Sequence, residues 1–197
     1  MKKRDFLKAG LLGLGAFLLP RKAAALEFYP MPSEKKWAVL FGTWCGTSRD
    51  AGIWISEGMG AIANVFDVRE NPDLSGYDHI VVGGSIRSNQ IPELLKEYLE
   101  KNRDVIEGKV RGLYAVCGNM MQPVDEEQYT VFIDYQLSTL TGAYHVPAKV
   151  FLGRITWGLM EPDVRERMQT IPGIIEYDNL KRSDCLDFGK EILKAAT

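Results

Sequence analysis

A loop of hydroxyl side chains and one glycine follows an apolar run in this chain: Thr43-Trp44-Cys45-Gly46-Thr47-Ser48. The run predicts a strand over 37–43, and a helix is expected to begin within 49–51. A strand that ends this way places backbone N–H groups and hydroxyls at a helix N-terminus, where the helix dipole favours an anion. Thr43, Thr47 and Ser48 are therefore candidate phosphate ligands, and Gly46 allows close backbone approach. An ordinary N-capped turn uses the same residue types, and capping does not exclude binding.

Two well-known phosphate motifs are absent from this loop. It contains neither the G-x-x-x-x-G-K-[ST] of nucleoside triphosphate sites nor the G-x-G-x-x-G of dinucleotide folds. The pattern that remains is hydroxyl-x-x-Gly-x-hydroxyl.

The N-terminus has the three regions of a signal peptide. Lys2, Lys3 and Arg4 precede an apolar segment at 9–19, and Ala23-Ala24-Ala25 is a small-residue cleavage site. We therefore expect a signal peptide over 1–25, a linker over 26–36 and an exported bacterial protein, periplasmic or on the outer face of the cytoplasmic membrane. The alternatives are retention at that membrane through an uncleaved N-terminus and a cytoplasmic protein with an apolar N-terminal helix. The apolar segment is too short to span a bilayer comfortably.

The charge of the remaining chain is acidic. Residues 1–25 hold six of the 24 basic side chains and one of the 26 acidic ones, so residues 26–197 carry a formal net charge of −7. An acidic body argues against nucleic acid as a partner and is compatible with docking onto basic redox proteins. The length and apolar content predict one domain, over 37–197.

Strand and helix patterns alternate along that domain. This alternation predicts an α/β parallel sheet with right-handed crossovers. The segment 154–182 interrupts the alternation and contains an amphipathic stretch at 163–170. A connection of this length is usually functional or mobile. The expected strands are 37–43, 64–68, 79–85, 112–118 and 148–152, and the expected helices run from 49–51 to about 62, then 93–102, 125–140 and 184–195.

The three cysteines lack the C-x-x-C spacing of a zinc site or a disulfide framework, so no metal is expected. Cys45 and Cys117 lie at the ends of strands that flank a third, roughly 9–10 Å apart. A disulfide tolerates about 7 Å between Cα atoms. We expect two small, partly buried thiols, with a redox role as the alternative. Cys185 falls on the buried stripe of the last helix.

A doubly wound sheet of order 2-1-3-4-5 binds ligands beyond the carboxyl ends of strands one, three and four. In this chain those ends carry the loops 43–48, 85–89 and 118–121. The arrangement resembles the flavodoxin family, which implies a three-layered flavodoxin-like fold with FMN as the cofactor. The implied cofactor-binding residues are Thr43, Trp44, Cys45, Gly46, Thr47, Ser48, Ser85, Ile86, Arg87, Ser88, Asn89, Cys117, Gly118, Asn119 and Met120.

The closest resemblance within that family is to the flavodoxin-type, quinone-dependent protoporphyrinogen oxidases. The segment 78–87 is similar to their third strand and Ser-Ile-Arg loop, as are the Asn119 loop, the strand end at 151–153 and Glu176-Tyr177. The insertion 154–182 also falls where that branch inserts a long loop. It is less basic than that branch would lead us to expect, and export does not suit a cytoplasmic step of haem synthesis. The segment Lys3 to Lys8 resembles a twin-arginine export signal with Lys in place of the first Arg; the general secretory route remains open.

The loops around the flavin differ from the usual flavodoxin pattern. Flavodoxins clamp the isoalloxazine between aromatics of the second and third loops, whereas this chain offers Ile86, Arg87, Met120 and Met121 there. The resemblance therefore implies an accessible flavin face, suited to a substrate or a quinone. Arg87 is expected to stabilise the reduced flavin and raise its potential; a solvated surface arginine is the alternative. Trp44 and Trp157 are expected either to approach the flavin or to serve as packing residues.

We therefore expect an exported FMN-binding oxidoreductase or electron-transfer protein that passes electrons to or from a quinone, a protein or a small molecule, with a possible peripheral membrane contact. The alternatives are an enzyme like menaquinone-dependent protoporphyrinogen IX dehydrogenase and a non-catalytic flavodoxin-like binding module. The absence of a carboxylate from 41–45 argues against a response regulator.

Overall fold

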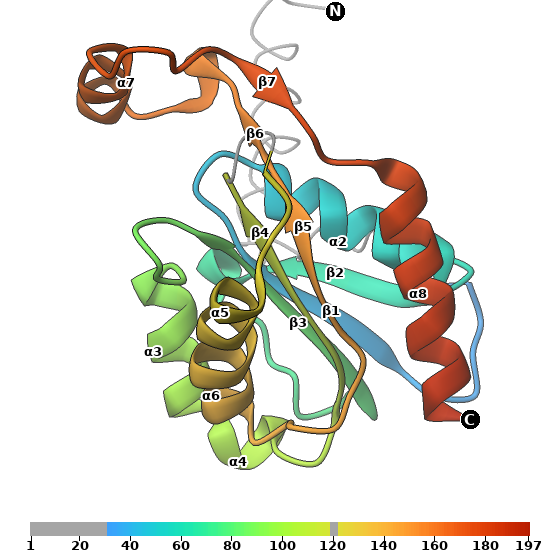
Figure 1. Ribbon diagram of the computed structural model, residues 1–197. Coiled ribbons are helices and arrows are strands. Elements are labelled where there is room, and N and C mark those ends of the chain that lie inside the picture. The colour runs from blue at the N-terminus through green and yellow to red at the C-terminus, as the bar shows by residue number, and fades with distance from the viewer. Residues whose placement is uncertain (1–30, 119–121) are drawn as a thin grey trace, which may run out of the picture.

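A five-stranded parallel sheet of order β2-β1-β3-β4-β5 forms the centre of the protein in the computed structural model, which describes residues 31–118 and 122–197 (Figure 1). Each neighbouring pair of strands is parallel. The predicted fold class and strand order are confirmed. The strands are β1 (Trp37–Gly42), β2 (Ala63–Asp67), β3 (His79–Ile86), β4 (Val110–Cys117) and β5 (Ala148–Leu152).

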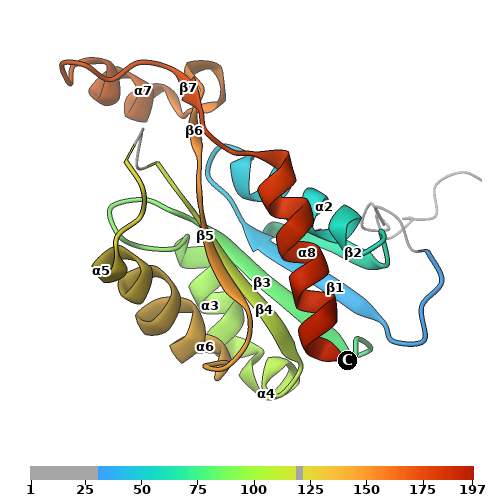
Figure 2. The same cartoon turned by 45° about the vertical axis from the view of Figure 1, so that its right-hand side comes forward.

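Helices cover both faces of the sheet, which gives three layers (Figures 1 and 2). One face carries α2 (Thr47–Gly58) and α8 (Arg182–Ala196), and the other carries α3 (Glu93–Lys101), α4 (Arg103–Ile106) and the helical segment 126–141. Side chains of β1 alternate between the two cores: Val39 packs with α2 and α8, and Leu40 packs with the opposite helices. This two-sided burial explains why the strand reads as an unbroken apolar run.

Helix α2 occupies 47–58, so the expected span, from 49–51 to about 62, was wrong at both ends. Two glycines, one in the last turn of α2 and one in α8, allow these helices to pack closely. A Cβ on Gly58 would lie 2.1 Å from the Leu186 carbonyl oxygen, and one on Gly189 would lie 2.2 Å from that of Ile55. The buried stripe predicted for α8 is confirmed, including Cys185, which is fully buried.

The predicted helix at 125–140 is continuous but not uniformly α-helical. Two short α-helical pieces, α5 (Glu126–Tyr129) and α6 (Thr139–Thr141), flank a π-helical segment, Thr130–Ser138, that the sequence pattern did not predict. Gly142, with φ of 72°, ends the segment as predicted. The other predicted boundaries differ from the structure by at most two residues: β4 begins at Val110, and Pro92 lies at the N-cap of α3 rather than at its first helical position.

The insertion at 154–182, here called the arm, projects beyond the edge where the parallel strands end (Figures 1 and 2). Its base is a two-stranded antiparallel ribbon of β6 (Arg154–Ile155) and β7 (Tyr177–Asp178). The 3-10 turn Trp157–Leu159 and helix α7 (Pro162–Gln169) lie between them. Helix α7 matches the amphipathic stretch predicted at 163–170.

Within 31–118 and 122–197, the structure has no helix long and apolar enough to cross a bilayer. The signal peptide predicted at 1–25 and the first part of the linker lie outside the described residues, as do Asn119, Met120 and Met121.

Candidate functional site

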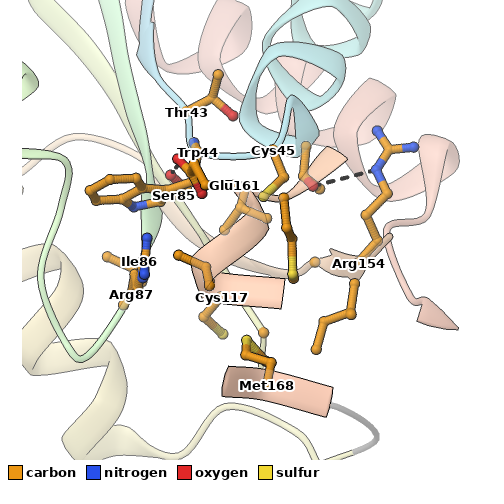
Figure 3. A pocket seen from close by; sticks show the side chains of 17 residues that line it. Thr43, Trp44, Cys45, Ser85, Ile86, Arg87, Cys117, Arg154, Glu161 and Met168 are labelled. Carbon is orange, nitrogen blue, oxygen red and sulfur yellow. Dashed lines mark hydrogen bonds between the residues drawn. The ribbon is translucent and has the colours of Figure 1, made fainter. Parts of the chain in front are cut away.

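A cavity lies at the carboxyl edge of the sheet, between the loops that follow β1, β3 and β4 and the arm (Figure 3). The described parts of the three predicted loops therefore come together where the strand order requires. Nine of the predicted site residues line this cavity: Thr43, Trp44, Cys45, Thr47, Ser85, Ile86, Arg87, Cys117 and Gly118.

The loop after β1 owes its shape to one glycine and to hydroxyl contacts. Gly46 has a φ of 82° and is the N-cap of α2, with no side-chain cap hydrogen bond from the described residues. Its N–H donates to Thr43 Oγ1 at 2.9 Å, and the N–H of Trp44 donates to Ser85 Oγ at 3.2 Å. Among residues 31–118 and 122–197, no side chain caps the first-turn N–H groups of α2 at the cavity edge.

Ser48, in the first turn of α2, is fully buried, and its Oγ has no hydrogen-bond partner in the part of the chain that the structure describes. The phenol of Tyr114 on β4 donates to the Ser48 carbonyl at 2.9 Å, which holds this turn against the sheet. Buried hydroxyls nearly always have a hydrogen-bond partner, so a buried hydroxyl without one needs an explanation. Ser48, like Gly46, is not among the described residues that line the cavity, but it lies beside Thr47 at a helix N-terminus that no described side chain caps, where an anion is favoured.

Arg87 and Trp44 face each other at the cavity. The Arg87 guanidinium lies 5.0 Å from the centre of the Trp44 ring, a cation–π contact. Ile86, Arg87 and Met120–Met121 include no aromatic side chain, but Trp44 of the first loop brings one to the cavity. Trp157 is not among the described lining residues; its backbone N–H donates to Glu176 Oε1 at 2.7 Å.

Ser88 and Asn89 build the turn that presents Arg87 and are not among the described residues that line the cavity. Both have positive φ, 51° and 60°, and the turn is closed by hydrogen bonds between the backbones of Arg87 and Gln90. Gln136, from the π-helical segment, accepts a hydrogen bond from the Ile91 N–H at 2.8 Å and donates one to the Asn89 carbonyl. The turn is therefore held from a helix that is distant in sequence.

Cys45 and Cys117 both line the cavity, and neither forms a disulfide within the described residues. Burial raises the pKa of the Cys45 thiol, the Glu161 carboxylate raises it further, and Arg87 opposes the shift. A neutral thiol is a poor nucleophile, so Cys45 is expected to be unreactive near neutral pH. The residues described by the structure contain no cluster of His, Cys, Asp or Glu that could hold a metal ion.

The arm supplies cavity residues that the sequence analysis did not identify. The length of the arm was already unusual in the sequence. The spacing of Val164 and Met168 at i and i+4 in an amphipathic stretch was the signal that could have identified them as residues of one buried helix face. Arg154 also lines the cavity, so its charged side chains include Arg87, Arg154 and Glu161. The arm residues at the cavity are Arg154, Ile155, Met160, Glu161, Val164 and Met168.

The comparisons with known proteins agree with this architecture. A family model described as a flavodoxin domain matches residues 38–178. Oxidised Flavodoxin 1 from Bacillus cereus is 18% identical, with a TM-score of 0.52 over 81% of this chain and 97% of that one. The flavodoxin, WrbA-like protein from Agrobacterium tumefaciens is 11% identical, with a TM-score of 0.53 over 82% and 98%. Fusobacterium nucleatum flavodoxin bound to flavin mononucleotide is 12% identical, with a TM-score of 0.50 over 82% and 96%. At these identities the likeness shows the fold. No curated protein sequence matches the chain.

Proposed function

The chain belongs to the flavodoxin family, and from this membership we propose that it binds FMN in the cavity described above and functions as a flavin-dependent electron-transfer protein or oxidoreductase. The observation that carries the proposal is the buried Ser48 hydroxyl at the N-terminus of α2, which has no hydrogen-bond partner, and the helix end no side-chain cap, among the described residues. A phosphate at this end would give that hydroxyl an acceptor and would meet the free N–H groups of the first turn.

The residues present fit the cofactor. Thr47 and Ser48, with the backbone after Gly46, would hold the phosphate. The loops after β3 and β4 would hold the ring system, since both line the same cavity. The loop after β4 is itself braced by the arm, because the Tyr177 hydroxyl donates to the Gly118 carbonyl at 2.8 Å.

FMN, when bound, supplies the capacity to accept and release electrons. The protein's own groups set the electrostatic environment and the access. The Arg87 cation favours negative charge nearby, while the Glu161 carboxylate, which also lines the cavity, opposes it. Ile155, Met160, Val164 and Met168 make one side of the cavity apolar, and an apolar lining strengthens the effect of both charges.

The electron donor or acceptor that we propose is a quinone or another apolar small molecule, with a redox protein as the alternative. The support is the apolar side of the cavity that the arm provides, together with exposed Leu159, Ile171 and Ile175 on the arm itself. Protoporphyrinogen dehydrogenation remains a second candidate, favoured by the position of this arm over the cavity. We also propose export and a peripheral membrane contact, on the strength of the basic, apolar and small-residue pattern over 1–25.

An FMN titration of the purified chain tests this proposal. Quenching of flavin fluorescence should reveal a saturable site, and the double substitution Thr47→Ala with Ser48→Ala should weaken it. Ser56→Ala is the matched control, because Ser56 lies on the same helix and donates to the Ala63 carbonyl at 2.8 Å, away from the cavity. Wild-type protein that shows no saturable flavin binding would refute the proposal and leave a binding module.

A further inference from the structure

Arg154 lies at the base of the arm and reaches the N-terminus of α2 (Figure 3). Its Nε donates to Thr47 Oγ1 at 3.4 Å, and its Nη2 pairs with the Asp50 carboxylate. Its Nη1 lies 3.5 Å from Asp178 Oδ2, on the partner strand of the ribbon. The side chain is 19% exposed and lines the cavity. A largely buried cation therefore lies beside one of the proposed phosphate ligands.

Without the Arg154 guanidinium, the charges at this end of α2 would disfavour an anion. Asp50 lies in the first turn of α2, where its carboxylate would repel a phosphate at the same helix end. Arg49 also pairs with Asp50 at 3.1 Å, but its side chain is 58% exposed, so water and salt screen it. Among the cations that the structure describes, Arg154 is the one that contacts Thr47 from a largely buried position.

The guanidinium also has donors to spare. It carries five N–H groups in a planar fork, and the contacts with Thr47, Asp50 and Asp178 engage at most three of them. Arg is well suited to a phosphate because two parallel N–H groups match two phosphate oxygens.

We propose that Arg154 makes this cavity selective for a phosphorylated flavin, by neutralising Asp50 and donating to the phosphate beside Thr47. This inference rests on the proposed function and assigns a binding role to a residue of the arm. Because Arg154 belongs to β6, phosphate binding also fastens the base of the arm to the loop after β1.

The experiment compares the dissociation constants of FMN and riboflavin, which differ only in the phosphate, for full-chain variants. Arg154→Ala should weaken FMN binding by about 10- to 100-fold, the range expected for a lost hydrogen bond to a charged group. Riboflavin binding should change by less than about twofold. Asp50→Asn should act in the opposite direction and tighten FMN, because it removes a negative charge from the same helix end.

The matched control is Arg182→Ala. Arg182 also forms an ion pair with α2, to Glu57 at 2.6 Å, but it is not among the described residues that line the cavity. This variant should leave both dissociation constants unchanged. Inorganic phosphate should compete with FMN for the wild-type protein and compete less well for Arg154→Ala, which would place the effect on the phosphate itself.

The outcomes separate the two proposals. Wild-type protein that binds neither flavin would refute the proposed function. Wild-type protein that binds both, with Arg154→Ala weakening FMN and riboflavin equally, would make Arg154 a structural residue and overturn the inference. If Arg154→Ala does not fold, Asp50→Asn tests the inference instead. An Asp50→Asn protein whose FMN affinity stays the same or falls, with its riboflavin affinity unchanged, would also overturn the inference.

Discussion

Replacing Ser48 with Ala should raise the stability of the flavin-free protein while weakening FMN binding. The Ser48 hydroxyl is fully buried and without a partner among the described residues. An unsatisfied buried polar group costs about 1–3 kcal/mol, so removing it should increase the free energy of unfolding by a similar amount. For a chain of 197 residues, each kcal/mol corresponds to about 2–4 °C in Tm.

The same substitution removes a hydroxyl that we assign to the phosphate. Loss of a hydrogen bond to a charged group, about 1.5–3 kcal/mol, corresponds to roughly 10- to 100-fold weaker FMN binding. At an FMN concentration of 100 times the wild-type Kd, ligand binding adds about 2.7 kcal/mol to wild-type stability. The variant should gain only about 0.4–1.4 kcal/mol at that concentration.

Thermal and urea unfolding with and without FMN measure both effects in one series. The expected pattern has opposite signs: the unliganded Tm rises and the FMN-induced increase in Tm shrinks. Ser56→Ala provides the comparison, because its buried hydroxyl is paired with Ala63 and its loss should lower the unliganded Tm without changing the FMN increment. A Ser48→Ala protein that is less stable without FMN, or that keeps the full FMN increment, would refute the assignment.

Three further predictions concern the cavity and the packing beneath it. Arg87→Ala should lower the flavin reduction potential, by about 30 mV for each 1.4 kcal/mol of lost stabilisation in a two-electron couple; Arg103→Ala, on α4, is the control, and an unchanged potential would remove Arg87 from the site. Burial raises the pKa of the Cys45 thiol, so its alkylation by iodoacetamide should be slow at neutral pH and increase only above the ordinary thiol range; rapid reaction at pH 7 would contradict this. Gly189→Ala should lower the free energy of unfolding by about 1–3 kcal/mol or more, because its Cβ would meet the Ile55 carbonyl. Gly76→Ala, which meets open space, should change little in the same urea titration. Equal effects at the two glycines would argue against close α2–α8 packing.

The sequence by itself was sufficient for the sheet and for most of the loops around the cavity. Parallel strands are covered on both faces, so they appear as apolar runs that local pattern detects directly. Once five such runs alternate with helices, the carboxyl ends of β1, β3 and β4 must meet at one edge. The hydroxyl and glycine pattern at 43–48 could then be placed at that edge without knowledge of any contact.

Some local features could not be predicted because they depend on a distant partner. The turn at Ser88 and Asn89 contains no glycine that would have indicated its positive φ, and it is held by Gln136 from another helix. The π-helical segment has no sequence feature that distinguishes it from an α-helix. Trp44 was expected to be either a flavin neighbour or a packing residue; the structure places its ring at the cavity, against the Arg87 guanidinium.

The arm shows most clearly what only the tertiary structure decided. Its sequence indicated an amphipathic helix between prolines, but amphipathicity does not specify which surface the apolar side will cover. In the sequence, Arg154 is only the first residue of an insertion. Its contacts could not be predicted, because its partners Asp50 and Thr47 are 104 and 107 residues away. A charged side chain acquires a binding role only when folding removes it from water and places it beside its partners. That juxtaposition is a property of the folded chain and not of any segment of it.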